Sequence, residues 1–243
     1  GMLSAGVLGN VFASPSVSSI LPAIRVVAGP MGVLLIIKNY TGDRLNFGMA
    51  AEMAKQEGIL VEMVIVADDC ALPLGKGITG GRGLAGTVFV HKIAGARASE
   101  GASLSEVLST ALSVGAYMGT LGIALTTCTV PGTPVSDRLS QIGLIEVGMG
   151  IHGEPGREQV VLPGTGAADF VANLLVSGVL DQPEAPEHAS KASHKRLSYT
   201  SGQRVVVLMN NLGALPVIEM QIVTGGVMRG LRQRGLVPVR AYC

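Results

Sequence analysis

The 243-residue chain is apolar and almost neutral, with 48% hydrophobic residues, 34 glycines and a formal net charge of +1. This charge, with only four Tyr and four Phe, supplies neither the basic surface nor the stacking platform that nucleic-acid binding needs. Apolar runs such as residues 33–37 are far shorter than the roughly 20 residues of a membrane helix. Cys70, Cys128 and Cys243 form no C-x-x-C pair, which argues against a disulfide scaffold or zinc knuckle. We therefore expect a cytoplasmic protein that binds neither nucleic acid nor membranes.

Short runs rich in Val, Ile and Leu alternate with segments of helical period, the pattern of strands covered by helices. In its first half the sequence predicts helices at 16–27, 43–56, 84–99 and 104–118, with strands at 33–38 and 61–67. In the second half it predicts strands at 122–127, 144–148, 204–209 and 236–241, with helices at 167–177 and 216–234. The expected fold class is α/β, with largely parallel or mixed sheets covered by helices.

The predicted helices also indicate how the chain is packed and divided. In the helix at 43–56, Leu45, Met49 and Met53 recur every four residues, which predicts one buried stripe. Two consecutive helices end near residue 118, where one set of strands gives way to the next. We expect a first α/β subdomain at 1–118 and a second at 119–243.

Polar residues gather where two of the predicted strands end. Residues 38–43 read KNYTGD, so Lys38, an amide and Asp43 lie where a buried strand gives way to a helix. Residues 148–156 read GMGIHGEPG, so His152 stands among four glycines directly after the strand at 144–148. Glycine lacks the Cβ atom that would keep another molecule away from the backbone and the imidazole. Two such clusters in an apolar chain indicate one site.

Each candidate residue also has a purely structural interpretation. Asp43 suits the positive end of a helix dipole, His152 could be incidental to a glycine turn, and His91 lies in an apolar segment typical of a core or interface imidazole. Chemistry favours function for His152 and Asp43, because a neutral imidazole can add to a carbonyl carbon and a carboxylate can accept the proton of an attacking hydroxyl. Together with Lys38 they suit phosphorylation of a small hydroxy-ketone or hydroxy-aldehyde.

Residues 81–86 read GRGLAG and match the dinucleotide fingerprint G-x-G-x-x-G, in which helix amides receive a pyrophosphate. More than ten residues separate this segment from the preceding strand, whereas a Rossmann turn follows its strand at once. Close packing of a helix on its neighbour is the better interpretation, and an NAD-type oxidoreductase is a weaker alternative. Residues 75–79, GKGIT, lack the spacing of a P-loop.

Motifs along nearly the whole chain point to one family. They are KNYTGDRLNFG at 38–48, GLAGTV at 83–88 with HK at 91–92, GTLG at 119–122, the segment at 148–156, NNLG at 210–213, GML at 1–3 and VFASP at 11–15. In these motifs the chain resembles the substrate-binding K domain of the dihydroxyacetone (glycerone) kinases.

The resemblance implies the K-domain fold of two α/β subdomains, usually in a homodimer. It implies that dihydroxyacetone is held as a covalent hemiaminal between a histidine and its C2 carbonyl. That histidine corresponds to His152, the base that accepts the proton of the attacking hydroxyl to Asp43, and the substrate-binding lysine to Lys38. Covalent capture requires a carbonyl, so glyceraldehyde is accepted and glycerol is rejected.

The resemblance also implies a partner. In the family ATP or ADP and magnesium bind to a helical L domain, fused C-terminally or separate, so no cofactor is expected on this chain; the phosphoryl donor is ATP or a phosphotransferase relay. The family's G-S-G-H-E-P element is not in the sequence, so we expect the first subdomain to lack its N-terminal part. We also expect the second subdomain to be incomplete at its C-terminus. The non-enzymatic alternative is a K-like ligand-sensing or coactivator module, against which Asp43 and His152 speak.

Overall fold

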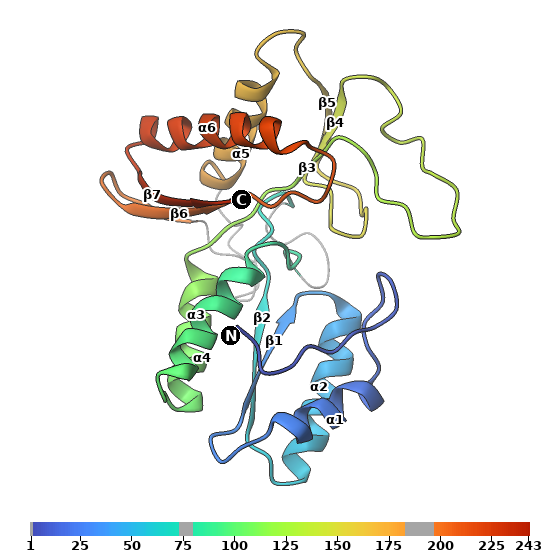
Figure 1. The fold of residues 1–243 in the computed structure, drawn as a ribbon, viewed down its shortest axis with the longest axis vertical. Helices are drawn as coiled ribbons and strands as arrows, with labels where there is room; N and C mark the ends of the chain where they lie inside the picture. Colours follow the sequence, from blue (N-terminus) through green and yellow to red (C-terminus); the bar gives the residue numbers. More distant parts are fainter. Residues whose placement is uncertain (1, 73–79, 183–196) are drawn as a thin grey trace. The chain divides into compact units, whose positions relative to one another are not determined.

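The computed structural model describes residues 2–72, 80–182 and 197–243, and these fall into two compact units (Figure 1). The first unit comprises residues 2–68 and 80–118, and the second comprises 69–72, 119–182 and 197–243. Each unit has its own strands and helices. The mixture of parallel and antiparallel sheets with covering helices confirms the predicted α/β class.

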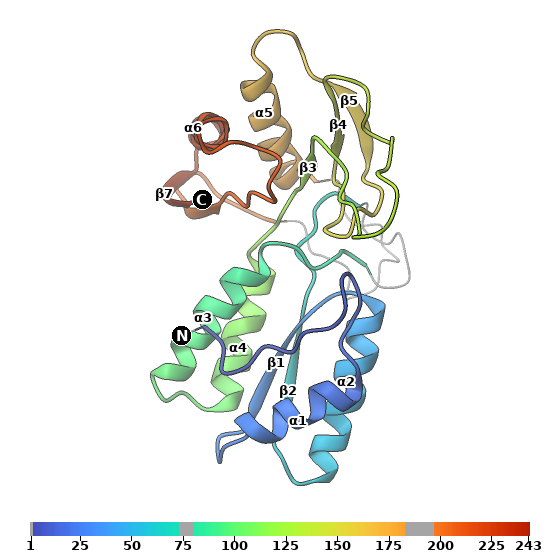
Figure 2. The same ribbon diagram turned by 45° about the vertical axis from the view of Figure 1, so that its right-hand side comes forward.

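The first unit has three layers (Figures 1 and 2). Parallel strands β1 (Val33–Lys38) and β2 (Val61–Val66) lie in the middle. Helices α1 (Val17–Val27) and α2 (Thr41–Gln56) cover one face, and α3 (Thr87–Ser99) and α4 (Leu104–Ala116) cover the other. Alternate residues of a strand point to opposite faces of the sheet. Because helices cover both faces, β1 is apolar at every position except its last, Lys38.

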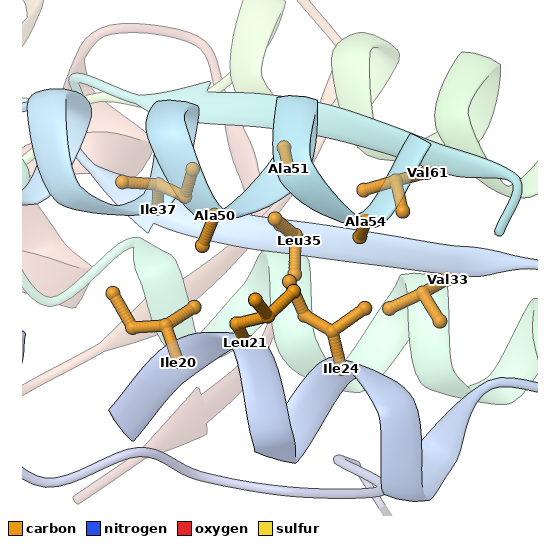
Figure 3. Close-up of a cluster of buried hydrophobic side chains, with 10 residues drawn as sticks. All are labelled: Ile20, Leu21, Ile24, Val33, Leu35, Ile37, Ala50, Ala51, Ala54 and Val61. Atoms are coloured by element: carbon orange, nitrogen blue, oxygen red, sulfur yellow. The ribbon is translucent and has the colours of Figure 1, made fainter. Parts of the chain in front are cut away.

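The core beside α1 and α2 shows this alternation directly. Val33, Leu35 and Ile37 of β1 pack with the buried side chains of the two helices (Figure 3). Leu34 and Ile36, one residue out of step, pack against the core beneath α3 and α4. The run of apolar residues at 33–37 is thus explained by a strand that is covered on both sides.

The predicted stripe on α2 is wrong. Leu45, Met49 and Met53 are exposed by 67%, 61% and 40%, whereas Ala50, Ala51 and Ala54 are fully buried. Small alanine side chains allow the helix axis to approach the sheet closely, and the larger apolar residues lie on the opposite side. A four-residue spacing identifies a helix face but does not identify the face that is buried.

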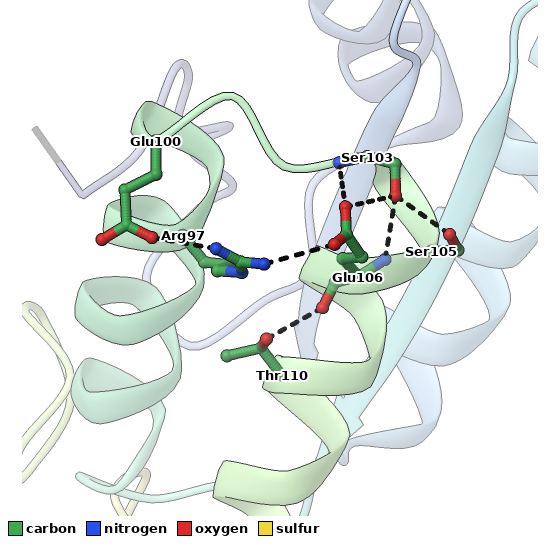
Figure 4. Close-up of polar contacts among 6 residues, drawn as sticks. All are labelled: Arg97, Glu100, Ser103, Ser105, Glu106 and Thr110. Carbon is green, nitrogen blue, oxygen red and sulfur yellow. Dashed lines mark hydrogen bonds and ion pairs between the residues drawn. The ribbon is translucent and has the colours of Figure 1, made fainter.

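Helix α3 begins at Thr87 and not at the predicted residue 84, since the preceding backbone amides bind a side chain (described below). Helix α4 begins with a capping box (Figure 4). The Glu106 amide donates to Ser103 Oγ at 3.4 Å, and the Ser103 amide donates to Glu106 Oε2 at 2.8 Å. Arg97 of α3 joins the two helices by its contact to Glu106 of α4, and it also pairs with Glu100 at the end of its own helix.

The second unit contains two sheets. Strands β3 (Ile123–Ala124), β4 (Leu144–Val147) and β5 (Glu158–Val161) form an antiparallel sheet in that order. Strands β6 (Arg204–Leu208) and β7 (Val237–Tyr242) pair in parallel. Helix α5 (Ala167–Leu180) lies between α6 (Val217–Gln233) and the β4–β5 hairpin (Figure 2).

Two predictions for this unit were incomplete. The strand expected at 122–127 is only two residues long, and β5 was not predicted because Glu158 and Gln159 make it polar and its side chains are mostly exposed. The pairing of β4 with β5, from Leu144 opposite Val161 to Val147 opposite Glu158, makes residues 148–157 the connection of a β-hairpin. His152 lies in that connection.

Candidate functional site

The predicted site residues of the first unit lie around the junction of β1 and α2. Lys38 is the last residue of β1, and Asp43 is in the first turn of α2, where the helix dipole favours a carboxylate. Both are partly buried. Between them the buried Asn39 fixes the chain, because its amide nitrogen donates to the Gly81 carbonyl at 2.7 Å. The structure thus brings Lys38 and Asp43 to one strand–helix connection.

The glycine-rich segment at 81–86 binds a carboxyl group of the protein itself. The Leu84 and Gly86 amides each donate to one oxygen of Asp68 at 2.7 Å, and Asp68 is fully buried. A Cβ at Gly86 would lie 2.5 Å from Asp68 Oδ2, and one at Gly83 would lie 2.6 Å from the Lys38 Cβ. The amides that would receive a pyrophosphate thus hold Asp68, and Gly83 and Gly86 are required by close packing. This geometry favours the packing interpretation over the dinucleotide one.

His91 of α3 is half-buried, in keeping with its structural interpretation. Burial lowers the pKa of its imidazole, and the positive charge of Lys38 lowers it further. His91 is therefore predominantly neutral at pH 7.

In the second unit, a tight turn presents His152. The Gly153 amide donates to the Gly150 carbonyl and the Gly150 amide donates to the Glu154 carbonyl, both at 3.0 Å. Gly148 and Gly153 have φ angles of +82° and +81°, which L-residues with a side chain rarely adopt. The glycines therefore shape the turn that carries His152 as well as reducing bulk around it.

Glu154 contacts His152 twice. Its Oε2 accepts the His152 backbone N–H at 3.0 Å, and its Oε1 lies 2.8 Å from the imidazole Nδ1. The His152 and Glu154 side chains are 28% and 34% exposed. Burial alone would raise the pKa of the Glu154 carboxyl, but the hydrogen bonds from the His152 ring and from backbone amides outweigh it and hold that pKa below its ordinary value. A carboxylate at neutral pH therefore faces the imidazole.

A second carboxylate secures the base of this hairpin connection. Glu146 of β4 is only 3% exposed; it accepts the Gly156 amide at 2.5 Å and pairs with Arg138 Nε at 2.9 Å. Arg138 also donates from Nη2 to the Gly153 carbonyl at 2.9 Å. The segment that follows His152 is thus held at Gly153 and at Gly156 by the ion pair of Arg138 with the buried Glu146.

Sequence reasoning missed both carboxylates. Glu146 stands inside an apolar run, where a charged residue needs a partner, and that was the available signal. Glu154 follows His152 by two residues, but nothing in this spacing alone distinguishes a contact from a solvated side chain. Lys38 and Asp43 belong to the first unit and His152 to the second.

Among the described residues, no group of three His, Cys, Asp or Glu side chains is arranged to hold a metal ion. None of the helices in the same residues is long and apolar enough to cross a membrane.

Comparison with known proteins identifies the class. The Dak1 domain family matches residues 1–243, and the chain belongs to this family. It is 51% identical, over all of its length, to a putative 3,4-dihydroxy-2-butanone kinase of Solanum lycopersicum. It covers 39% of that relative, so the chain spans about two fifths of the length of a curated relative that it matches.

Solved structures agree with this assignment. The dihydroxyacetone kinase from C. freundii in complex with AMP-PNP and Mg²⁺ matches 99% of this chain and 42% of its own, with a TM-score of 0.78 and 41% identity. A dihydroxyacetone kinase operon co-activator, Dha-DhaQ, matches 95% of this chain and 66% of its own, with a TM-score of 0.82 and 31% identity. The predicted K-domain fold is confirmed.

Proposed function

We propose that this chain is the substrate-binding part of a dihydroxyacetone kinase and that His152 holds the triose as a covalent hemiaminal. The observation that carries the proposal is a partly exposed imidazole, presented by a glycine turn, in a chain that matches the Dak1 family along its whole length. Relatives of this chain are described as kinases of dihydroxyacetone and of a related hydroxy-ketone.

The chemistry assigns a role to each predicted site residue. The imidazole of His152 adds to the C2 carbonyl carbon, which fixes the triose and selects ketones and aldehydes over glycerol. Asp43 accepts the proton of the terminal hydroxyl as that oxygen attacks phosphorus. Lys38 donates a hydrogen bond that orients the substrate. This proposal requires all three residues to act on one triose.

The nucleotide is proposed to bind elsewhere. The C. freundii kinase binds AMP-PNP and Mg²⁺ in a chain of which this one covers 42%, and the glycine-rich segment here holds Asp68. We therefore assign ATP and magnesium to an L-type domain, in cis or in trans, and expect the K domain to act as a homodimer. The kinase that results would phosphorylate dihydroxyacetone or glyceraldehyde.

A second candidate function is a ligand-sensing or coactivator module, which the similarity to Dha-DhaQ favours. Such a module could bind a triose without transferring phosphate. Adding an L-type partner and ATP, and then assaying dihydroxyacetone phosphate, separates the two. Product formation identifies the kinase, and capture of the triose without product identifies the sensor.

Covalent capture can be tested by intact-protein mass spectrometry after incubation with dihydroxyacetone. We expect the chain to gain the mass of one triose with no loss of water, because a hemiaminal is an addition product. The His152→Ala variant should show no adduct, whereas the matched control His91→Gln should retain it. Equal adduct on the His152→Ala and unsubstituted chains would refute the proposal.

The role of Asp43 can be separated from capture. Asp43→Asn removes the base but not the nucleophile, so the adduct should form normally while phosphoryl transfer with an L-type partner falls roughly a hundredfold or more. An undiminished transfer rate would exclude Asp43 as the base.

A further inference from the structure

We propose that Glu154 is a positioning residue that fixes His152 in the tautomer whose Nε2 nitrogen carries the nucleophilic lone pair. This inference rests on the proposed function, since the tautomer of His152 bears on catalysis only if His152 adds to the triose. Glu154 itself touches neither the substrate nor the reacting carbon in this account; it acts through the imidazole.

The positions of two hydrogen-bonding atoms assign the proton. Glu154 Oε1 lies 2.8 Å from Nδ1 of His152, and a carboxylate can only accept a hydrogen bond. The low pKa of the Glu154 carboxyl keeps it ionised at neutral pH, so the hydrogen between the two atoms belongs to Nδ1. A neutral imidazole with its proton on Nδ1 has its in-plane lone pair on Nε2.

The backbone contact makes this arrangement specific. The second oxygen of Glu154 accepts the His152 N–H at 3.0 Å, so one carboxylate holds both the main chain and the ring of the same residue. Gly153, between them, has a φ of +81°, and the turn is closed by hydrogen bonds between Gly150 and Gly153 and between Gly150 and Glu154. The ring is therefore limited in rotation as well as in tautomer, as the carboxylate of a catalytic triad limits its histidine.

The covalent step balances with these groups and water. The Nε2 lone pair forms the bond to the carbonyl carbon, and the π electron pair of the C=O bond moves to the oxygen, which takes a proton from water. The ring then carries a positive charge, and its Nδ1–H faces the Glu154 carboxylate. The Nδ1 proton stays on the ring, where the Glu154 carboxylate accepts its hydrogen bond and balances the imidazolium charge, and the hydroxide formed from water leaves to the solvent. No oxidant or reductant is needed.

The test combines a substrate-free measurement with a kinetic one. Nitrogen NMR of the imidazole should show Nδ1 protonated and Nε2 unprotonated in the unsubstituted chain, and Glu154→Gln should lose this strong bias. Adduct formation with dihydroxyacetone should slow by about tenfold or more in Glu154→Gln. Glu154→Asp, which keeps the charge, should recover part of the rate. Glu158→Gln, a neighbouring exposed carboxylate paired with Arg157, should behave as the unsubstituted chain.

The outcomes separate this inference from the function on which it rests. Normal capture by Glu154→Gln, or an Nε2-protonated ring in the unsubstituted chain, overturns the role of Glu154 and leaves capture by His152 intact. Absence of any adduct on the unsubstituted chain overturns the proposed function, while the NMR measurement still decides the tautomer. If Glu154→Gln does not fold, the ring nitrogens of the unsubstituted chain and the Glu154→Asp rate give the same decision.

Discussion

Gly148 and Gly143 have nearly the same backbone conformation but different surroundings. Their φ angles are +82° and +77°. A Cβ at Gly148 would lie 2.3 Å from the Ala71 Cβ, whereas nothing lies within 4 Å of a Cβ at Gly143. At the start of the His152 turn, glycine is therefore required by close approach as well as by conformation.

This pair of glycines gives a matched test. Gly143→Ala should cost about 1–2 kcal/mol, the strain of a left-handed backbone, and Gly148→Ala should cost at least about 1 kcal/mol more because it also overpacks the site. Denaturant unfolding of both variants measures the difference. Equal losses of unfolding free energy in the two variants would show that close approach to Ala71 does not add to the cost of a side chain at Gly148.

Asp68 gives a second test at the scale of single residues. In Asp68→Ala the buried Leu84 and Gly86 amides lose their acceptor, and each unsatisfied group costs about 1–3 kcal/mol. We expect a loss of at least about 2 kcal/mol in unfolding free energy, while the exposed Glu62→Gln should stay within about 0.5 kcal/mol.

Titration of the unsubstituted chain with NADH should leave its fluorescence unchanged, because Asp68 already occupies the amides. Saturable NADH binding, or an Asp68→Ala variant as stable as its parent, would contradict the packing interpretation of the glycine-rich segment.

At the scale of the element, α2 separates a correct prediction from a wrong one. Its position and its Asp43 terminus were predictable, because a polar strand end followed by a helical period is a local pattern. Its buried face was not predictable, since alanines and the larger Leu45, Met49 and Met53 are both apolar and only the distance between helix and sheet chooses between them. Close packing here selects the smaller side chains.

The corrected face of α2 can be tested by substitution. Ala51→Leu should destabilise the chain by about 1–3 kcal/mol through overpacking, whereas Met49→Ala, on the exposed face, should change the unfolding free energy by less than about 0.5 kcal/mol. Thermal or denaturant unfolding decides between the two faces. The opposite ranking would restore the predicted stripe as the buried one.

In the hairpin that carries His152, local sequence patterns again predicted only part of the structure. Strand β4 was predicted from its apolar run, but β5 is polar and is held by pairing with β4, which a local pattern does not reveal. The same holds for Glu154: its identity is in the sequence, and its contact with His152 depends on a turn closed by hydrogen bonds. A single sequence does not reveal a strand that depends on long-range pairing, nor a contact that depends on the geometry of a turn.

At the scale of the whole molecule, the chain is a two-unit α/β protein whose predicted site residues come from both units. The chain spans 39% of the Solanum relative. We assign triose capture to this chain and nucleotide binding to an L-type domain. Incubated with dihydroxyacetone and ATP but no L-type partner, the chain should capture the triose and form no phosphate ester.

The central claim is the carbon–nitrogen bond between His152 and the triose. The most direct measurement is carbon NMR of the chain with dihydroxyacetone isotopically labelled at its carbonyl. We predict that the bound carbonyl resonance is replaced by that of a tetrahedral carbon coupled to a ring nitrogen of His152, and that glycerol has no effect on the His152 ring. A bound triose that keeps its ketone resonance, or an unchanged tetrahedral signal in His152→Ala, would contradict the account.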